Sequence, residues 1–215
     1  MSRRRVYGTT KDIGGKMLID IKGYSNGRVD LVNSVTGEVG TSPNAFLVNT
    51  TLEGVAFTST NGGNFSNIPP YSTNFNLEVE LYDPGDQVWG HGYCFSLYGM
   101  FLMTTRNGWG GLAWQSPDWS AWGFINSNWH IDPPTGARLP LNRWTKHRLF
   151  VDFSSGRPVS NYWVDGVQTV FNQTNIIIGF TKGTTLSIAR HSGNNPTNVL
   201  WRNLQVKEIS IPPSL

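Results

Sequence analysis

Charged residues are scarce in this 215-residue chain. They make up only 14% of it, and the formal net charge is +3. Part of that excess is the run Arg3-Arg4-Arg5, a short basic terminus of the kind that is usually a solvated tail. The rest of the chain is close to neutral, so the composition does not indicate a nucleic-acid partner.

Cysteine is nearly absent as well. Cys94 is the only one, so no internal disulfide can form, and its apolar neighbours predict a buried small hydrophobe rather than a nucleophile. No hydrophobic run reaches the length of a membrane span, and no apolar segment follows the basic N-terminus as it would in a signal peptide. We therefore expect a protein that is made in a reducing cytoplasm and is not inserted in a membrane.

A clustered metal-binding motif is also missing. The histidines are scattered, without the spacing of zinc ligands, at His91, His130, His147 and His191. Asp83 and Asp86 flank Pro84-Gly85, and with neighbouring carbonyl groups they would suit Ca²⁺, although Asp and Gly serve a turn without any metal. We expect no cofactor, with Ca²⁺ at Asp83 and Asp86 as the alternative.

The chain is instead rich in turn formers and aromatic residues, with 24 glycines and 13% Phe, Trp and Tyr. Residues 75–82 alternate apolar and polar, which predicts one buried and one exposed face. Asp165-Gly166 separates two alternating runs and predicts a hairpin, and Asn26-Gly27 predicts another. Residues 92–103 are apolar on both faces, which predicts one central strand.

Further strands are predicted at 51–58, 148–153, 175–179, 186–190 and 204–211, and no segment has a convincing helical period. Many short, evenly spaced strands predict an all-β fold, an antiparallel two-sheet jelly-roll sandwich. We assign this domain to residues 41–215. Residues 1–40 are predicted to be an N-terminal extension that serves attachment or oligomerisation.

One stretch carries a more specific signal. Residues 142–152, NRWTKHRLFVD, followed by YWVDGV at 162–167, resemble the laminin-G-like, concanavalin-A-like lectin/glucanase superfamily. Residues 186–190 and 201–209 resemble the later strands of that superfamily, and the likeness covers roughly residues 45–211. It implies a concanavalin-A-like jelly roll, an architecture that hosts lectins, polysaccharide hydrolases, lyases and structural modules.

The resemblance implies two enzymatic alternatives. Glucanases of the superfamily use a Glu-x-Asp-x-x-Glu strand, and Glu78-Val-Glu80-Leu-Tyr-Asp83 is similar in charge, with Glu78 and Glu80 about 6–7 Å apart on one face. Glu replaces the central Asp, however, and Asp replaces the final Glu, so a solvated strand face is the simpler interpretation. Lyases of this fold use a cluster of a His, a Tyr and an Arg or Gln on the concave sheet, for which the chain offers His91, Tyr93, Arg106 and His130 without the motifs of those families.

Residues 107–130, NGWGGLAWQSPDWSAWGFINSNWH, hold five of the nine tryptophans. Polar residues are interleaved with them, and this combination suits a sugar, whose C–H faces stack on flat rings while its hydroxyls bond to polar groups. Some of the rings would serve the core or a subunit contact, because Trp119 and Trp122 differ by an odd number and would face opposite sides of a strand. We predict a ligand-binding platform made of Trp114, Asp118, Trp119, Asn128, Trp129 and His130.

These observations predict a non-catalytic, lectin-like module that binds polysaccharide or cell-surface glycan. A lectin-like chain with no disulfide and no export signal fits a viral particle, that of a bacteriophage, assembled in the host cytoplasm as a homo-oligomer or with other virion proteins. The alternative location is the cytoplasm. The alternative functions are a depolymerase that uses Glu78 and Glu80 and a purely structural decoration protein.

Overall fold

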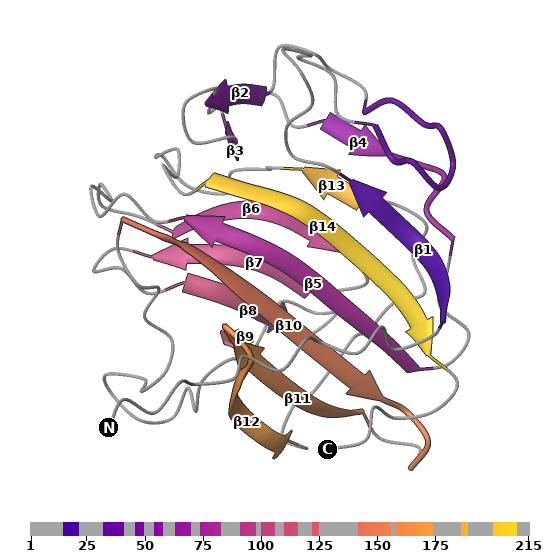
Figure 1. Ribbon diagram of the computed structural model, residues 1–215, viewed down its shortest axis with the longest axis vertical. Helices are drawn as coiled ribbons and strands as arrows, with labels where there is room; N and C mark the ends of the chain where they lie inside the picture. The colour runs from indigo at the N-terminus through magenta and orange to yellow at the C-terminus, as the bar shows by residue number, and fades with distance from the viewer. Residues whose placement is uncertain are drawn as a thin grey trace, which may run out of the picture.

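The computed structural model is built from antiparallel strands. It describes residues 15–21, 32–40, 46–49, 54–57, 63–69, 74–82, 91–97, 100–105, 110–115, 122–124, 142–155, 158–173, 186–188 and 200–209, and no helix occurs in these ranges. Figure 1 shows the strands arranged as two layers, with the larger sheet in front of the smaller one. The predicted all-β sandwich is confirmed.

The larger sheet has eight strands. Their order is β12-β11-β10-β5-β14-β3-β2, and β1 also pairs with β14. The bounds are β1 (Lys16–Ile21), β2 (Phe46–Asn49), β3 (Gly54–Phe57), β5 (Asn74–Tyr82), β10 (Trp144–Asp152), β11 (Val159–Val164), β12 (Val167–Gln173) and β14 (Leu200–Ile209).

The smaller sheet has six strands in the order β4-β13-β6-β7-β8-β9. Their bounds are β4 (Gly63–Phe65), β6 (His91–Leu97), β7 (Met100–Thr105), β8 (Gly110–Gln115), β9 (Trp122–Phe124) and β13 (Leu186–Ile188). Strands distant in sequence are neighbours in both sheets, since β5 lies between β10 and β14 in the larger one and β13 lies between β4 and β6 in the smaller one.

The core follows the alternation of β5. Leu77, Val79 and Leu81 are at most 1% exposed, whereas Glu78 and Glu80 between them remain partly exposed. Trp201 of β14 and Tyr162 of β11 are the largest fully buried side chains among the residues whose burial is described. The predicted alternation of buried and exposed positions is therefore confirmed for residues 77–82, whereas Asn76, predicted on the exposed face, is only 4% exposed.

The hairpin predicted at Asp165-Gly166 is present. β11 ends at Val164 and β12 begins at Val167, and both turn residues have positive φ, 49° for Asp165 and 79° for Gly166. Two central residues in this conformation form the turn whose twist matches that of the flanking strands.

Two details differ from the sequence-based expectation. Residues 92–103 contain two strands rather than one, because the chain reverses and β6 pairs with β7 from His91↔Thr105 to Leu97↔Met100. An apolar run that continues across a tight reversal has no turn signal of the Asn-Gly kind to mark it. In addition, β4 lies between the strands predicted at 51–58 and 75–82, where the sequence predicts none.

The described part of the N-terminal segment belongs to the sandwich. β1, within the predicted extension 1–40, pairs with β14 along its whole length, and Leu18, Ile19 and Ile21 are fully buried. Ile21 forms a further antiparallel bridge with Asn33. The Asn26-Gly27 turn and the strand predicted at 175–179 lie outside the described residues.

Candidate functional site

A strip of aromatic and charged side chains covers the outer face of the larger sheet. Residues directly opposite each other on antiparallel strands share a face. The register pairs Trp144 with Tyr82, Lys146 with Glu80, Arg148 with both Glu78 and Trp163, and Arg202 with Glu80. We call this set the outer strip: Glu78, Glu80, Tyr82, Trp144, Lys146, Arg148, Trp163 and Arg202.

One end of the outer strip is built around Trp144. Its ring centroid lies 5.6 Å from that of Tyr82, and the Arg202 guanidinium carbon lies 4.1 Å from the Trp144 ring centroid. The Arg202 Nε donates to Glu80 at 2.6 Å, and the Asn203 amide donates to the other Glu80 oxygen at 3.2 Å. The Glu80 carboxylate therefore fixes the cation that covers the tryptophan.

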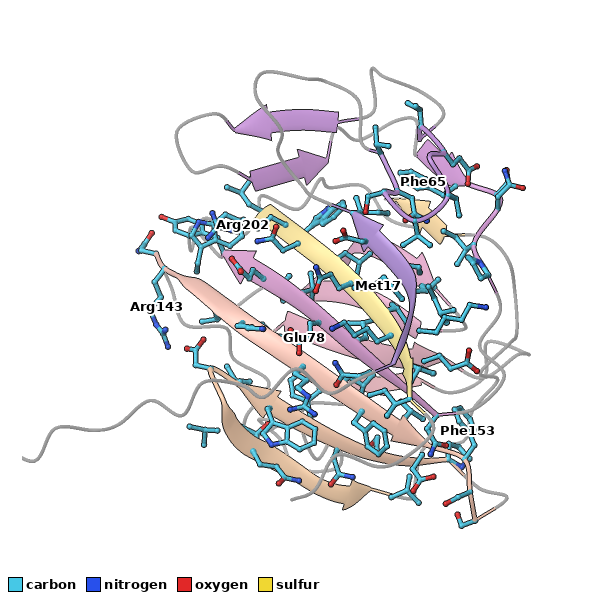
Figure 2. The ribbon with its side chains drawn as sticks, turned by 45° about the vertical axis from the view of Figure 1, so that its right-hand side comes forward. Met17, Phe65, Glu78, Arg143, Phe153 and Arg202 are labelled. Atoms are coloured by element: carbon cyan, nitrogen blue, oxygen red, sulfur yellow. The ribbon has the colours of Figure 1, made fainter. Side chains whose placement is uncertain are left out.

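The middle of the outer strip is the Lys146–Glu78 ion pair. The Lys146 Nζ lies 2.5 Å from Glu78 Oε2, and the Asn76 amide donates to Glu78 Oε1 at 3.4 Å. The Lys146 side chain is 45% exposed, so solvent screens the pair and it contributes little to stability. Figure 2 shows Glu78 and Arg202 on this same side of the sheet.

The other end of the outer strip combines Arg148 with Trp163. The Arg148 Nε donates to Asn76 Oδ1 at 2.7 Å, and the guanidinium carbon lies 4.7 Å from the Trp163 ring centroid. Burial lowers the pKa of Arg148 from its ordinary value, although the nearby Glu78 charge opposes this shift. Arg148 stays a cation, because arginine retains its proton far above neutral pH.

A hydrogen-bonded clamp fixes where β10 begins. The Asp165 carboxylate accepts from the Lys146 backbone N–H at 2.9 Å and from Arg143 Nη1 at 2.7 Å, and the Asp165 N–H donates to the Lys146 carbonyl at 2.8 Å. The β11–β12 turn is thereby tied to the first residues of β10. This tie positions Trp144 and Lys146 relative to Trp163.

A buried polar group lies on the opposite face of β10. His147 is 1% exposed, with Nε2 at 2.9 Å from Thr145 Oγ1 and Nδ1 at 2.8 Å from the Tyr162 hydroxyl. Thr145 donates its proton to the Leu81 carbonyl at 3.2 Å, so its oxygen accepts from Nε2–H and Tyr162 donates to Nδ1. Burial lowers the pKa of His147 to about 4, against a weaker opposing effect of Asp165.

The predicted carboxylate pair is brought together, with a cation on each member. Glu78 and Glu80 lie on one face as expected, paired with Lys146 and Arg202 respectively. Both carboxylates are therefore engaged by side chains of this chain.

The other predicted site residues are placed only in part. Trp114 lies in β8 and pairs with Met100 and Gly123, while Trp122 lies in β9 and pairs with Gln115. His91 and Tyr93 of the lyase alternative lie in β6. The residues outside the described ranges are Asp83, Asp86, Arg106, Asp118, Trp119, Asn128, Trp129 and His130.

Neither a metal cluster nor a membrane-spanning helix occurs in the described ranges. They contain no group of three or more His, Cys, Asp or Glu that could hold a metal ion. No helix in the same ranges is long and apolar enough to cross a membrane.

Apart from Glu78 and Glu80, the residues of the outer strip were not predicted as a site from the sequence. Trp144 and Trp163 belong to the motifs that carry the fold resemblance, and Trp144, Lys146 and Arg148 stand at alternate positions that must share a face of any strand. The contribution of Arg202 has no such local signal. It depends on pairing between β14 and β5, which are far apart in the sequence.

Comparisons with known proteins place the fold. No protein-family model and no curated protein matches the sequence. Among solved structures, the binding domain of botulinum neurotoxin serotype D is similar at a TM-score of 0.62 with 13% identity, covering 93% of this chain and 50% of that one. Domain 4 of AbnA, an extracellular GH43 arabinanase from Geobacillus stearothermophilus solved with arabinotriose, gives 0.58 with 17% identity over 90% and 93% of the two chains.

A sialidase from Trypanosoma rangeli is also similar, at a TM-score of 0.58 with 14% identity over 91% of this chain and 31% of that one. This chain thus spans about half of the botulinum neurotoxin binding domain and nearly all of the arabinanase domain. At these identities the likeness establishes a shared β-sandwich fold. Function has to be argued from the site.

Proposed function

We propose that this protein is a non-catalytic carbohydrate-binding module and that the outer strip is its binding surface. The observation that carries the proposal is the placing of two half-buried tryptophans, each under an arginine, on one sheet face with two ion-paired glutamates. Aromatic rings serve the C–H faces of sugars, and ordered charged pairs offer donors and acceptors to hydroxyl groups.

The outer strip is ordered before any ligand arrives. Asn76, Asn203 and the Asp165 clamp hold the charged groups and the start of β10 by direct hydrogen bonds. A surface whose side chains are already fixed loses less conformational entropy on binding, so more of the contact energy remains for affinity. This preorganisation supports a binding role for the strip.

The similar structures support the same class of ligand. The arabinanase domain was solved in complex with arabinotriose, and cell entry of botulinum neurotoxin type C, another protein of similar structure, depends on interaction with two ganglioside molecules. These ligands are bound by the similar proteins, and for this chain they indicate that glycans are the first class of ligand to test.

The test is a screen of the full chain against a glycan array and cell-surface polysaccharides. Trp144→Ala and Trp163→Ala should each weaken saturable binding by about tenfold or more, as expected for loss of a stacking ring. The matched comparison is Trp114→Ala, Trp119→Ala and Trp129→Ala, which probe the platform predicted from sequence. Binding lost only in this second group would move the site to that platform, and no binding to any glycan would refute the proposal.

Product release measured in the same samples tests the enzymatic alternative. A binding module leaves the polysaccharide intact over hours. Reducing ends or unsaturated products that disappear in Glu78→Gln or Glu80→Gln would show a depolymerase instead.

We also propose a finer assignment, that the module is carried on a virion, that of a bacteriophage, as a receptor-binding or decoration protein. Its support is the combination of a carbohydrate-binding fold with a single cysteine, which permits folding in host cytoplasm without disulfides. Labelling of intact particles with an antibody to the purified chain tests it. Absence of the chain from particles whose genome encodes it would overturn this assignment.

A further inference from the structure

Arg148 has unused hydrogen-bonding capacity. Its Nε is bonded to Asn76, but Nη2 is enclosed and has no hydrogen-bond partner among the described residues. An enclosed donor without an acceptor costs free energy, more so when the group is charged. An acceptor from outside the described part of the chain would remove that cost.

The geometry of Arg148 suits an anionic acceptor. Asn76, which is 4% exposed, fixes one edge of the guanidinium, and the ring of Trp163 lies against the group with its centroid 4.7 Å from the guanidinium carbon. A planar guanidinium held in this way keeps one orientation, and the guanidinium fork matches a carboxylate or a sulfate through two parallel hydrogen bonds.

The charges around Arg148 point the same way. The neighbouring carboxylates already have cations, Glu78 with Lys146, Glu80 with Arg202 and Asp165 with Arg143. Arg148 forms no ion pair of this kind with a described residue, and the Glu78 charge acts on it only at longer range. The outer strip therefore carries one more cation than anion.

We propose that the ligand of the outer strip is an acidic polysaccharide and that Arg148 binds its carboxylate or sulfate group. This inference rests on the proposed function. It adds that the ligand is negatively charged and that Arg148 binds the charged group. Trp163 would pack against the sugar ring that bears the acidic group. Lys146, which is exposed on the same face two residues away, adds a longer-range attraction.

The experiment measures binding of the full chain to three soluble polymers: polygalacturonate for carboxylates, dextran sulfate for sulfate esters and dextran as the neutral control. We expect an acidic polymer to bind and dextran to bind at least tenfold more weakly. Arg148→Gln should reduce acidic-polymer binding by about tenfold or more, because a charge-assisted bidentate contact is lost. Preference between the two acidic polymers identifies the source of the anion.

Two variants distinguish bidentate hydrogen bonding by the Arg148 guanidinium from a general effect of positive charge. Arg148→Lys keeps the charge and loses the fork, so it too should bind weakly. Lys16→Gln makes the same charge change at an exposed residue of β1 that lies outside the outer strip, and it should change binding by less than about twofold. Thermal unfolding of each variant checks the fold, and Arg148→Lys replaces Arg148→Gln if the latter unfolds.

Each outcome decides the inference. Equal binding by wild type and both Arg148 variants would overturn it, as would stronger binding of dextran than of either acidic polymer. In those cases the carbohydrate-binding proposal stands without the charge preference. If no polymer and no arrayed glycan binds, the proposed function fails together with this inference.

Discussion

His147 is held neutral by its hydrogen bonds as well as by burial. Protonation would place a proton on Nδ1, which now accepts from Tyr162, and would bury a charge in the core. The folded-state pKa of His147 is about 4, compared with about 6.5 for an exposed histidine. The unfolded chain therefore takes up a proton in a pH range in which the folded protein does not.

The free energy of unfolding should consequently fall as the pH drops from about 6.5 to about 4, with a contribution from His147 of about 3 kcal/mol. Above pH 6.5 both states are neutral at His147, and below pH 4 both are protonated, so the loss is confined to this window. Urea unfolding at pH 7.0, 5.5 and 4.5 measures it. His147→Asn removes the titrating group, so its free energy of unfolding should fall less over this pH range than that of wild type. An equal pH dependence in both proteins would show that His147 is not the cause.

The Tyr162 hydroxyl provides a second test of the buried group. Tyr162→Phe removes the donor to His147 Nδ1 and leaves a buried acceptor unsatisfied, so we expect a loss of about 1–3 kcal/mol. Tyr82→Phe, which changes a tyrosine at the outer strip, is the control and should cost less than about 0.5 kcal/mol. Comparable losses in both variants, measured by urea unfolding at pH 7, would contradict the buried hydrogen bond.

The outer strip shows which parts of a site a sequence can reveal. Trp144, Lys146 and Arg148 share a face by simple alternation, so this part was within reach of the sequence. The pairing of Arg202 with Glu80 was not, because it requires β14 to lie beside β5 with the correct register. A bulge at Asn203, whose φ is 53°, also shifts that register, and no local sequence pattern predicts the bulge.

At the level of elements, the β11–β12 hairpin depends on a turn of unusual conformation. Gly166 has a φ of 79°, a region that costs other residues about 1–2 kcal/mol. Gly166→Ala should lose that amount in the free energy of unfolding, and it should also loosen the Asp165 clamp on β10. Gly166→Asn is the control, because Asn tolerates this conformation, and an equal loss in both variants would argue against backbone strain as the cause.

Strands with strict alternation or recognisable turn residues at their ends could be predicted from the sequence, and the other strands could not. β5 has strict alternation and the β11–β12 hairpin has an Asp-Gly turn, so the sequence predicts the bounds of β5 to within one residue and the position of the turn. The sequence predicts β6 and β7 as one strand, because hydrophobic residues fill both and Gly99 between them has no Asn or Asp before it to complete a hairpin signal. β4 has only three residues and is paired to distant β13, which leaves no period to detect.

For the molecule as a whole, the larger sheet joins the two ends of the described chain. β1 pairs with β14, so the N-terminal strand closes the core that the C-terminal strand helps to form. Leu18, Ile19 and Ile21 are fully buried, and each contributes about 1.5–3 kcal/mol by leaving water. This role is structural and would coexist with attachment or oligomerisation by other parts of residues 1–40.

Deletion of residues 1–21 should therefore destabilise the entire sandwich. The loss of three buried aliphatic side chains is comparable to the whole stability of a typical domain, about 5–15 kcal/mol. We expect the truncated chain to lose its cooperative thermal transition in scanning calorimetry. A truncated protein that unfolds at the same temperature as the full chain would show that β1 is dispensable.

The most direct test of where this protein binds carbohydrate is oxidative footprinting of its tryptophans with and without a polysaccharide that the screen identifies. Mass spectrometry reports the modification of each ring separately, so the outer strip and the platform at residues 114–130 are compared in one sample. We predict that the polysaccharide protects Trp144 and Trp163 and leaves Trp114, Trp119 and Trp129 unchanged. Protection of the second group alone would show that the ligand does not bind the outer face of the larger sheet.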